Sequence, residues 1–243
     1  MTAPADRSTT PVPPNLRPRD AATLVIIDRS LAAPRVLMGR RSSRHAFMPG
    51  NYVFPGGRVD RWDVSMPVAD DLAPVSLEKL LVDMKGKPSP RRARALALAA
   101  VRETWEESGI MLGAECAAAS AARLPKGWRS FGERRILPRL SDLRFVGRAI
   151  TPPRRPRRYD TRFFAVFTDS IAYREPGETR LTAELEDVGW LTFTEARETN
   201  LPGVTLRMID HLERRLQDDP LLNGEASVPY YYLLHGKLRH SEI

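Results

Sequence analysis

The segment ALALAAVRETWEESGIML, residues 95–112, joins an apolar helical stripe to three closely spaced glutamates, and this combination constrains the fold more than any other feature. At about 100° per residue, Leu98, Val101 and Trp105 share one side of a helix and the acidic residues spread over the other. These acidic residues are Glu103, Glu106 and Glu107. Neighbouring carboxylates repel, which costs a few tenths of a kcal/mol per pair. We therefore expect the apolar side to pack and the acidic side to face outward, where solvent screens the repulsion or a cation removes it.

Strand-like runs and helical patterns are interspersed along the rest of the chain without a regular βαβ repeat. The runs 21–28 and 35–41 predict an antiparallel hairpin. Further strands are expected at 143–151, 161–168 and 186–193, and further helices at 76–84 and 204–217. This pattern favours an α/β fold in which helices pack on the faces of a mixed sheet.

The chain has 243 residues, of which 42% are hydrophobic, and this is enough to bury the core of a globular protein. Its longest uncharged apolar run, residues 95–101, is far shorter than the roughly 20 residues that cross a bilayer. Residues 1–19 are polar and proline-rich and lack the apolar core of a secretory signal, so we expect a flexible leader, dispensable through about Arg17. We expect residues 20–243 to form a single cytoplasmic domain without a membrane span.

Arginine dominates the charge of the chain, in which 38 Lys and Arg exceed 30 acidic residues to give a net charge of +8. Guanidinium groups match phosphate oxygens, so this balance favours a phosphate-bearing partner. The segment PPRRPRRYD, residues 152–160, has four arginines, and GRRSSRH, residues 39–45, adds a second basic stretch. Like charges at such density are unfavourable without a bound anion. We expect the loop Pro152–Tyr159 to face the acidic cluster and hold substrate phosphates; the alternative is a solvated loop.

A glycine turn upstream of the glutamate helix favours a cation over solvent screening. The segment FPGG, residues 54–57, ends a predicted strand, and its glycines allow a sharp turn that exposes backbone carbonyls. A hard divalent cation such as Mg2+ takes oxygen ligands and keeps waters for substrate phosphates. Three carboxylates and a glycine carbonyl would supply those ligands. Taken alone, each motif has a plainer alternative, a solvated helix face or a β-turn. We assign Phe54 and Trp105 to core packing.

RETWEESGI, residues 102–110, resembles the second half of the Nudix box of the Nudix hydrolases, written G-x5-E-x7-R-E-U-x-E-E-x-G-U with U aliphatic. GRVDRWD, residues 57–63, resembles the first half, with Asp63 in the place of the first glutamate. Thr104 stands where an aliphatic residue is usual, and an insertion at about 64–92 adds about 31 residues between the halves. Added loop length costs little free energy, so the helix can keep its place, although Asp63 becomes an uncertain ligand. The resemblance implies a Nudix-type α/β/α sandwich, a mixed β-sheet with helices on both faces.

The resemblance also implies an activity, the hydrolysis of a diphosphate linked to another moiety with Mg2+ or Mn2+ as cofactor. The metal ligands that it implies are Glu103, Glu106, Glu107 and the carbonyl of Gly57. Arg102, four residues before Glu106, would orient the cluster. One carboxylate must accept the proton of the attacking water. Glu103 is the first candidate, and Glu184 is the second because some family members supply the base from that region.

FMPGNYVFPGG before the inserted box and RRYDTRFF after it resemble the branch that contains the peroxisomal coenzyme A diphosphatase. This resemblance implies a small-molecule nucleotide-diphosphate substrate, with coenzyme A first and NADH or ADP-ribose next. The residues expected to contact it are Arg44, Gly56, Arg154, Arg157 and Arg158. The upstream coenzyme A signature is only half present, because Ala46 stands where its arginine is expected.

Two other functions stay open. The basic surface also suits removal of 5′ phosphates from RNA, which would bind through counterion release, and RNA is the less favoured partner. A catalytically silent nucleotide sensor is the other alternative, but a sensor has no need to keep carboxylates that repel one another. A homodimer stays open as well.

Overall fold

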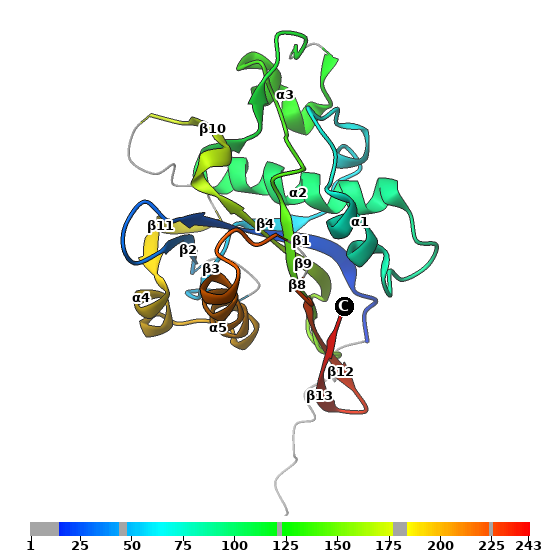
Figure 1. The fold of residues 1–243 in the computed structure, drawn as a ribbon. Helices are drawn as coiled ribbons and strands as arrows, with labels where there is room; N and C mark the ends of the chain where they lie inside the picture. The colour runs from blue at the N-terminus through cyan, green and yellow to red at the C-terminus, as the bar shows by residue number, and fades with distance from the viewer. Residues whose placement is uncertain (1–14, 44–47, 121–122, 177–183, 224–225) are drawn as a thin grey trace, which may run out of the picture.

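The computed structural model describes residues 15–43, 48–120, 123–176, 184–223 and 226–243. Within these ranges nine strands form one mixed sheet in the order β11-β2-β1-β9-β8-β12-β13, with β3 beside β2 and β4 beside β1 (Figure 1). The strands are β1 (Arg19–Asp28), β2 (Arg35–Arg41), β3 (Tyr52–Val53), β4 (Gly56–Arg58), β8 (Arg144–Ile150), β9 (Tyr159–Phe167), β11 (Leu185–Thr192), β12 (Pro229–Leu234) and β13 (Lys237–Glu242).

The described helices are α1 (Pro74–Leu81), α2 (Pro90–Ser108), α3 (Arg129–Glu133), α4 (Phe193–Glu198) and α5 (Gly203–Asp218). Two small sheets lie outside the main one: β5 (Ile110–Leu112) pairs with β10 (Ile171–Arg174), and β6 (Ala114–Glu115) pairs with β7 (Ile136–Leu137). No helix in the described ranges has both the length and the apolar character that a membrane crossing requires.

The predicted hairpin is present, since β1 and β2 are antiparallel with Ile27 opposite Val36. The other predicted strands correspond to β8, β9 and β11, and the predicted helices to α1, α2 and α5. β1 pairs with β9 in parallel over nine residue pairs, from Arg19 with Tyr159 to Ile27 with Phe167. This long-range pairing places β1, the first strand of the described residues, inside the sheet.

Both faces of the sheet carry an apolar core. Leu24 and Ile26 of β1 pack in one core with residues of α1 and α2, and Val25 and Ile27 pack in another with residues of α4 and α5. Successive side chains of a strand point to opposite faces, so one apolar run serves both layers. Figure 1 shows α1 and α2 over one face and α4 and α5 over the other. The expected α/β/α sandwich is confirmed.

The glutamate helix α2 has clear signals at both ends. Pro90 opens it, at a position where a helix does not need the missing N–H. Gly109 closes it with φ 69°, a left-handed conformation that favours glycine. Trp105 is buried and meets the ring of Phe131 edge-on at 6.5 Å. The hydroxyl of Thr104 donates to the Ala100 carbonyl at 2.8 Å, so a polar residue at this buried position is satisfied within the helix.

The predicted leader and insertion both contain residues that touch the fold. Arg158 donates from Nη1 to Asn15 Oδ1 at 2.8 Å and to the Leu16 carbonyl at 2.6 Å, and β1 already begins at Arg19. Residues 15–19 are thus part of the domain, and residues 1–14 lie outside the described residues. The proposed insertion at 64–92 includes α1, which packs against α2, and the first residues of α2.

Candidate active site

The glycine turn of β4 lies directly against the glutamate helix. The N–H of Gly56 donates to Glu107 Oε2 at 2.8 Å. A Cβ on Gly57 would lie 2.5 Å from Glu103 Oε1, and a Cβ on Gly56 would lie 2.5 Å from the Ala22 carbonyl oxygen. A side chain at Gly57 would therefore collide with Glu103 of α2, and one at Gly56 would collide with the backbone of β1. The two glycines are required for this close approach, in addition to any turn conformation.

Three carboxylates gather beside this turn. Glu103, Glu107 and Glu184 each offer one oxygen, and these oxygens lie within 4.8 Å of one another. Glu184 reaches the helix because β11 runs antiparallel to β2, with Leu185 opposite Arg41, and because the Ser42 N–H donates to the Glu184 carbonyl at 3.1 Å. The structure thus brings together residues from two elements 77 positions apart in the sequence, Glu107 of α2 and Glu184 before β11.

The acidic face of α2 is not uniformly exposed, which corrects the expectation from the sequence. Glu107 is buried under the glycine turn, and Glu106 remains exposed. Glu106 stands outside the group of three carboxylates, and its Oε2 accepts from Arg102 Nη1 at 3.0 Å. Glu103 and Glu107, four residues apart on the helix, lie at the glycine turn, while Glu106 is exposed and shares Arg102 Nη1 with Glu103.

Arg102 holds this arrangement through five hydrogen bonds, one for each N–H of its guanidinium group. Nη1 donates to Glu103 Oε1 at 2.9 Å and to Glu106 Oε2 at 3.0 Å. Nε donates to Asp63 Oδ1 at 2.8 Å, and Nη2 donates to Asp63 Oδ2 at 3.1 Å and to the Arg58 carbonyl at 3.0 Å. Arg102 is buried, and the surrounding carboxylates keep its pKa above the ordinary value despite that burial. It is a positioning residue.

Asp63, an uncertain metal ligand from the sequence, is the main partner of Arg102. Its carboxylate is fully buried and also accepts from Trp128 Nε1 at 3.2 Å and from the Asp60 N–H at 2.7 Å. Both oxygens are occupied by these donors, and Asp63 stands outside the group of three carboxylates. The structure therefore shows that Asp63 holds the guanidinium of Arg102 in place.

The electrostatics of the carboxylates fit a divalent cation. Burial raises the pKa of Glu103 to about 7. Burial, and then the charge of Glu103, raises the pKa of Glu107 well above its ordinary value. Glu107 Oε1 is buried and has no hydrogen-bond partner among the described residues. Three hard oxygen donors with an unsatisfied buried oxygen among them match the donor set that Mg2+ or Mn2+ takes.

A family model of the NUDT19 Nudix domain matches residues 18–202, which is most of the chain. The chain belongs to the Nudix hydrolases. A Caenorhabditis elegans protein called "Putative nudix hydrolase 7" is 26% identical over 182 residues, which are 71% of this chain and 51% of that protein, so the chain spans about half the length of this curated relative. The crystal structure of a NUDIX hydrolase from Alicyclobacillus acidocaldarius is 28% identical, with a TM-score of 0.60 over 83% of this chain and 96% of that one.

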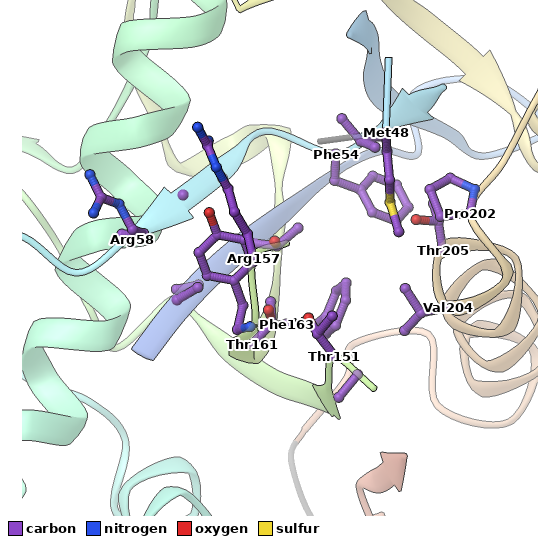
Figure 2. Close-up of a pocket in the computed structure, with 18 of the residues that line it drawn as sticks. Met48, Phe54, Arg58, Thr151, Arg157, Thr161, Phe163, Pro202, Val204 and Thr205 are labelled. Atoms are coloured by element: carbon purple, nitrogen blue, oxygen red, sulfur yellow. Dashed lines mark hydrogen bonds between the residues drawn. The ribbon is translucent and has the colours of Figure 1, made fainter. Parts of the chain in front are cut away.

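Two of the three carboxylates of this Nudix domain lie at the wall of a pocket of about 320 Å³. Glu103 and Glu184 line it together with Gly56 and Gly57. Figure 2 shows Arg58 and Arg157 at one side and an apolar wall at the other. The labelled residues of that wall are Met48, Phe54, Phe163, Pro202 and Val204. Phe54 thus packs in the core, as expected, and also presents a face to the pocket.

The predicted phosphate-binding arginines divide into separate groups. Arg157, in the loop Pro152–Tyr159, lines the same pocket as Glu103 and Glu184. Arg158 is engaged by backbone and side-chain oxygens, including the Thr151 carbonyl at 3.0 Å. Arg154 is exposed and absent from the lining of the pocket. Arg44 lies outside the described residues. Arg58 also lines the pocket but lies outside the two basic stretches of the sequence; its position directly after the two turn glycines is a usable signal.

Proposed function

We propose that this Nudix domain is a divalent-cation-dependent hydrolase that cleaves the diphosphate linkage of a nucleoside diphosphate joined to another moiety. The observation that carries the proposal is the group of Glu103, Glu107 and Glu184, whose oxygens lie within 4.8 Å of one another beside an open pocket. Such a group is unfavourable by itself, since burial raises the pKa values of Glu103 and Glu107. A cation that binds there relieves this cost.

The residues that would hold Mg2+ or Mn2+ are these three glutamates, with Glu106 and the Gly57 carbonyl as further candidates. A bound divalent cation supplies charge screening for the phosphates and lowers the pKa of water. Arg102 would hold Glu103 and Glu106 in place without touching substrate. The hydrogen bonds to Asp63 fix the guanidinium of Arg102, so the carboxylates that would bind the cation are oriented before it binds.

The proton of the attacking water needs a carboxylate that faces the pocket. Glu103 is the first candidate because it lines the pocket next to Gly57. Glu184 is the second candidate because it lines the same pocket and is more exposed. The backbone at Gly56 allows the substrate phosphates to approach closely, and Arg157 and Arg58 would bind phosphate oxygens at the pocket rim.

The shape of the pocket supports a substrate with dissimilar ends. Arginines lie at one side, and the apolar wall with Phe54 and Val204 lies at the other (Figure 2). A diphosphate-linked nucleotide cofactor, coenzyme A first and NADH or ADP-ribose next, carries charged and less polar groups in one molecule. A flat RNA-binding surface would not need this apolar wall.

A substrate panel with Mg2+ or Mn2+ tests this function. Coenzyme A, NADH, ADP-ribose and a 5′-triphosphorylated RNA would be incubated with the protein and the products weighed by mass spectrometry. We expect cleavage within the diphosphate of a cofactor, loss of activity with EDTA, and loss in the Glu107→Gln variant. Cleavage of RNA alone, with activity that falls by orders of magnitude from low to moderate salt, would favour the RNA alternative. Binding of cofactors without any turnover would favour the sensor.

A further inference from the structure

A second cavity, a groove of about 610 Å³, lies beside the carboxylate pocket. Two distant segments form it, residues 16–19 and residues 156–159, together with Arg58. Five of its nine lining residues are arginines, and no described acidic residue lines it. The five are Arg17, Arg19, Arg58, Arg157 and Arg158. We call this cavity the arginine groove.

The chain fixes the two walls of the arginine groove against each other. β1 and β9 are parallel, with Arg19 opposite Tyr159, and the Arg19 N–H donates to the Arg158 carbonyl at 2.9 Å. Arg158 in turn donates to Asn15 and to Leu16. The arginine groove is therefore built by paired backbone, and Arg158 supports its wall from within.

The other four arginines present an uncompensated positive charge. Arg17, Arg19, Arg58 and Arg157 are exposed, and none of them forms an ion pair with a described acidic residue. Elsewhere in the domain arginines are paired closely, as Arg92 is with Asp20 at 2.6 Å. Several like charges around one concavity raise the local positive potential and attract a compact anion.

The arginine groove continues the carboxylate pocket, because Arg58, Arg157 and Tyr159 line both cavities. A ligand whose diphosphate lies near Glu103 can therefore extend past these three residues into the groove. We propose that the arginine groove is a subsite for a phosphomonoester carried by the same substrate molecule as the diphosphate. This inference rests on the proposed function and adds Arg17 and Arg19 to the residues that select the substrate.

A binding experiment tests the subsite without turnover. Adenosine 3′,5′-bisphosphate and AMP differ only in one phosphomonoester, and their dissociation constants would be measured by calorimetry. We expect the wild-type protein to bind the bisphosphate at least about 10-fold more tightly than AMP, because the additional phosphate gains charge-assisted hydrogen bonds. The Arg17→Ala/Arg19→Ala variant should lose this preference. The Arg154→Ala/Arg155→Ala variant removes the same charge from residues that line neither cavity and should keep it.

Several results would overturn the subsite. These are an unchanged preference in Arg17→Ala/Arg19→Ala, an equal loss in the control variant, or an equal loss of affinity for AMP. Tighter binding of a 5′-phosphorylated oligoribonucleotide than of the bisphosphate, lost in the same variant with a steep salt dependence, would replace the subsite with an RNA contact. Circular dichroism establishes that both variants are folded. If the preference depends on Arg17 and Arg19 but no panel compound is cleaved, the subsite stands and the proposed function fails.

Discussion

Two networks of buried carboxylates and arginines in this domain differ in the direction in which the carboxylate pKa is shifted, down for Asp160 and up for Glu107. Around Asp160, every carboxylate oxygen of two aspartates accepts from an arginine. Arg148 Nε and Nη2 donate to Asp160 at 2.9 and 2.8 Å. Arg162 Nη1 lies 3.2 Å from Asp160 Oδ1 and donates to Asp20 at 3.2 Å, and Arg92 donates to Asp20 at 2.6 Å. Around Glu107, by contrast, carboxylates face carboxylates and one buried oxygen has no described partner.

The pKa values show what this difference means. Burial acts to raise the pKa of Asp160, but the hydrogen bonds from Arg148 and the charge of Arg162 outweigh it and lower the pKa below the ordinary value. Burial raises the pKa of Glu107 with no arginine close enough to reverse it. Burial acts in the same direction on both carboxylates, so the difference between their pKa values comes from their partners. Every carboxylate oxygen of the Asp160 network is paired with an arginine, although Arg162 Nε and Nη2 have no hydrogen-bond partner among the described residues. We therefore call the Asp160 network complete for its carboxylates, and we call the glutamate group, with its unpartnered buried oxygen, incomplete.

The largest effect should come from removing one carboxylate charge from the glutamate group. Glu107→Gln should lower kcat by several orders of magnitude in Mg2+ while the protein stays folded, because one negative ligand is lost from the cation site. Glu106→Gln is the matched control, and its loss should be smaller because Glu106 lies outside the group of three. Turnover would be measured with the best substrate of the panel. Near wild-type turnover of Glu107→Gln would contradict the assignment.

The same substitution in the complete network should act on stability. Asp160→Asn leaves Arg148 and Arg162 buried without their main partner, and breaking a buried pair in this way costs about 3 to 5 kcal/mol. Urea unfolding followed by circular dichroism measures the change. Glu107→Gln should leave the free energy of unfolding unchanged or raise it. Equal destabilisation by both variants would remove the distinction between the networks.

Stability should depend on pH in opposite ways for the two networks. In metal-free protein the folded pKa of Glu103 is about 7 against an ordinary 4.5, so folding gains up to about 3 kcal/mol below pH 4.5 that is lost as the pH rises through 7. The pKa of Asp160 is lowered, so its contribution is present above its ordinary pKa and lost as the pH falls below it. Urea unfolding in EDTA from pH 4.5 to 7.5 should show a decline in wild type that Glu103→Gln flattens and Asp160→Asn retains.

The smallest effect should be the gain in stability when a divalent cation binds at the glutamate group. Mg2+ or Mn2+ at 100 times its dissociation constant should stabilise the domain by about 2.7 kcal/mol, a rise of several degrees in Tm. Differential scanning fluorimetry with and without EDTA measures it. Glu107→Gln should lose most of the shift, and Asp160→Asn should keep it from a lower starting Tm. A shift that survives in Glu107→Gln would place the cation elsewhere.

Local sequence patterns predicted the parts of this fold that depend on neighbouring residues. The hairpin β1–β2, the helix α2 with its stop at Gly109, and the proximity of Gly56 to the glutamates all followed from periodicity or motif. The resemblance to the Nudix box supplied the α/β/α layers. Apolar periodicity also predicted α5, because one side of that helix packs against the sheet.

Long-range pairings could not be predicted in the same way. Asp63 contacts Arg102 across 39 positions, and the sequence shows neither the buried site nor Trp128 as a third member. The parallel pairing of β1 with β9 gives no local signal, so residues 15–19 read as a leader. The hairpin β12–β13 was missed because its second strand is mostly exposed and polar.

The parallel pairing of β1 with β9 also sets the order in which the domain can be assembled on the ribosome. Arg162, the hydrogen-bond partner of Asp20, is synthesised 142 residues later. At about 5–20 residues per second this delay is roughly 7 to 30 seconds. During that time β1 can pair only with β2 and β4, and its other edge lacks β9. A strand edge left open in this way is a site for wrong association. The nascent chain is therefore most vulnerable to aggregation before Phe167 has emerged.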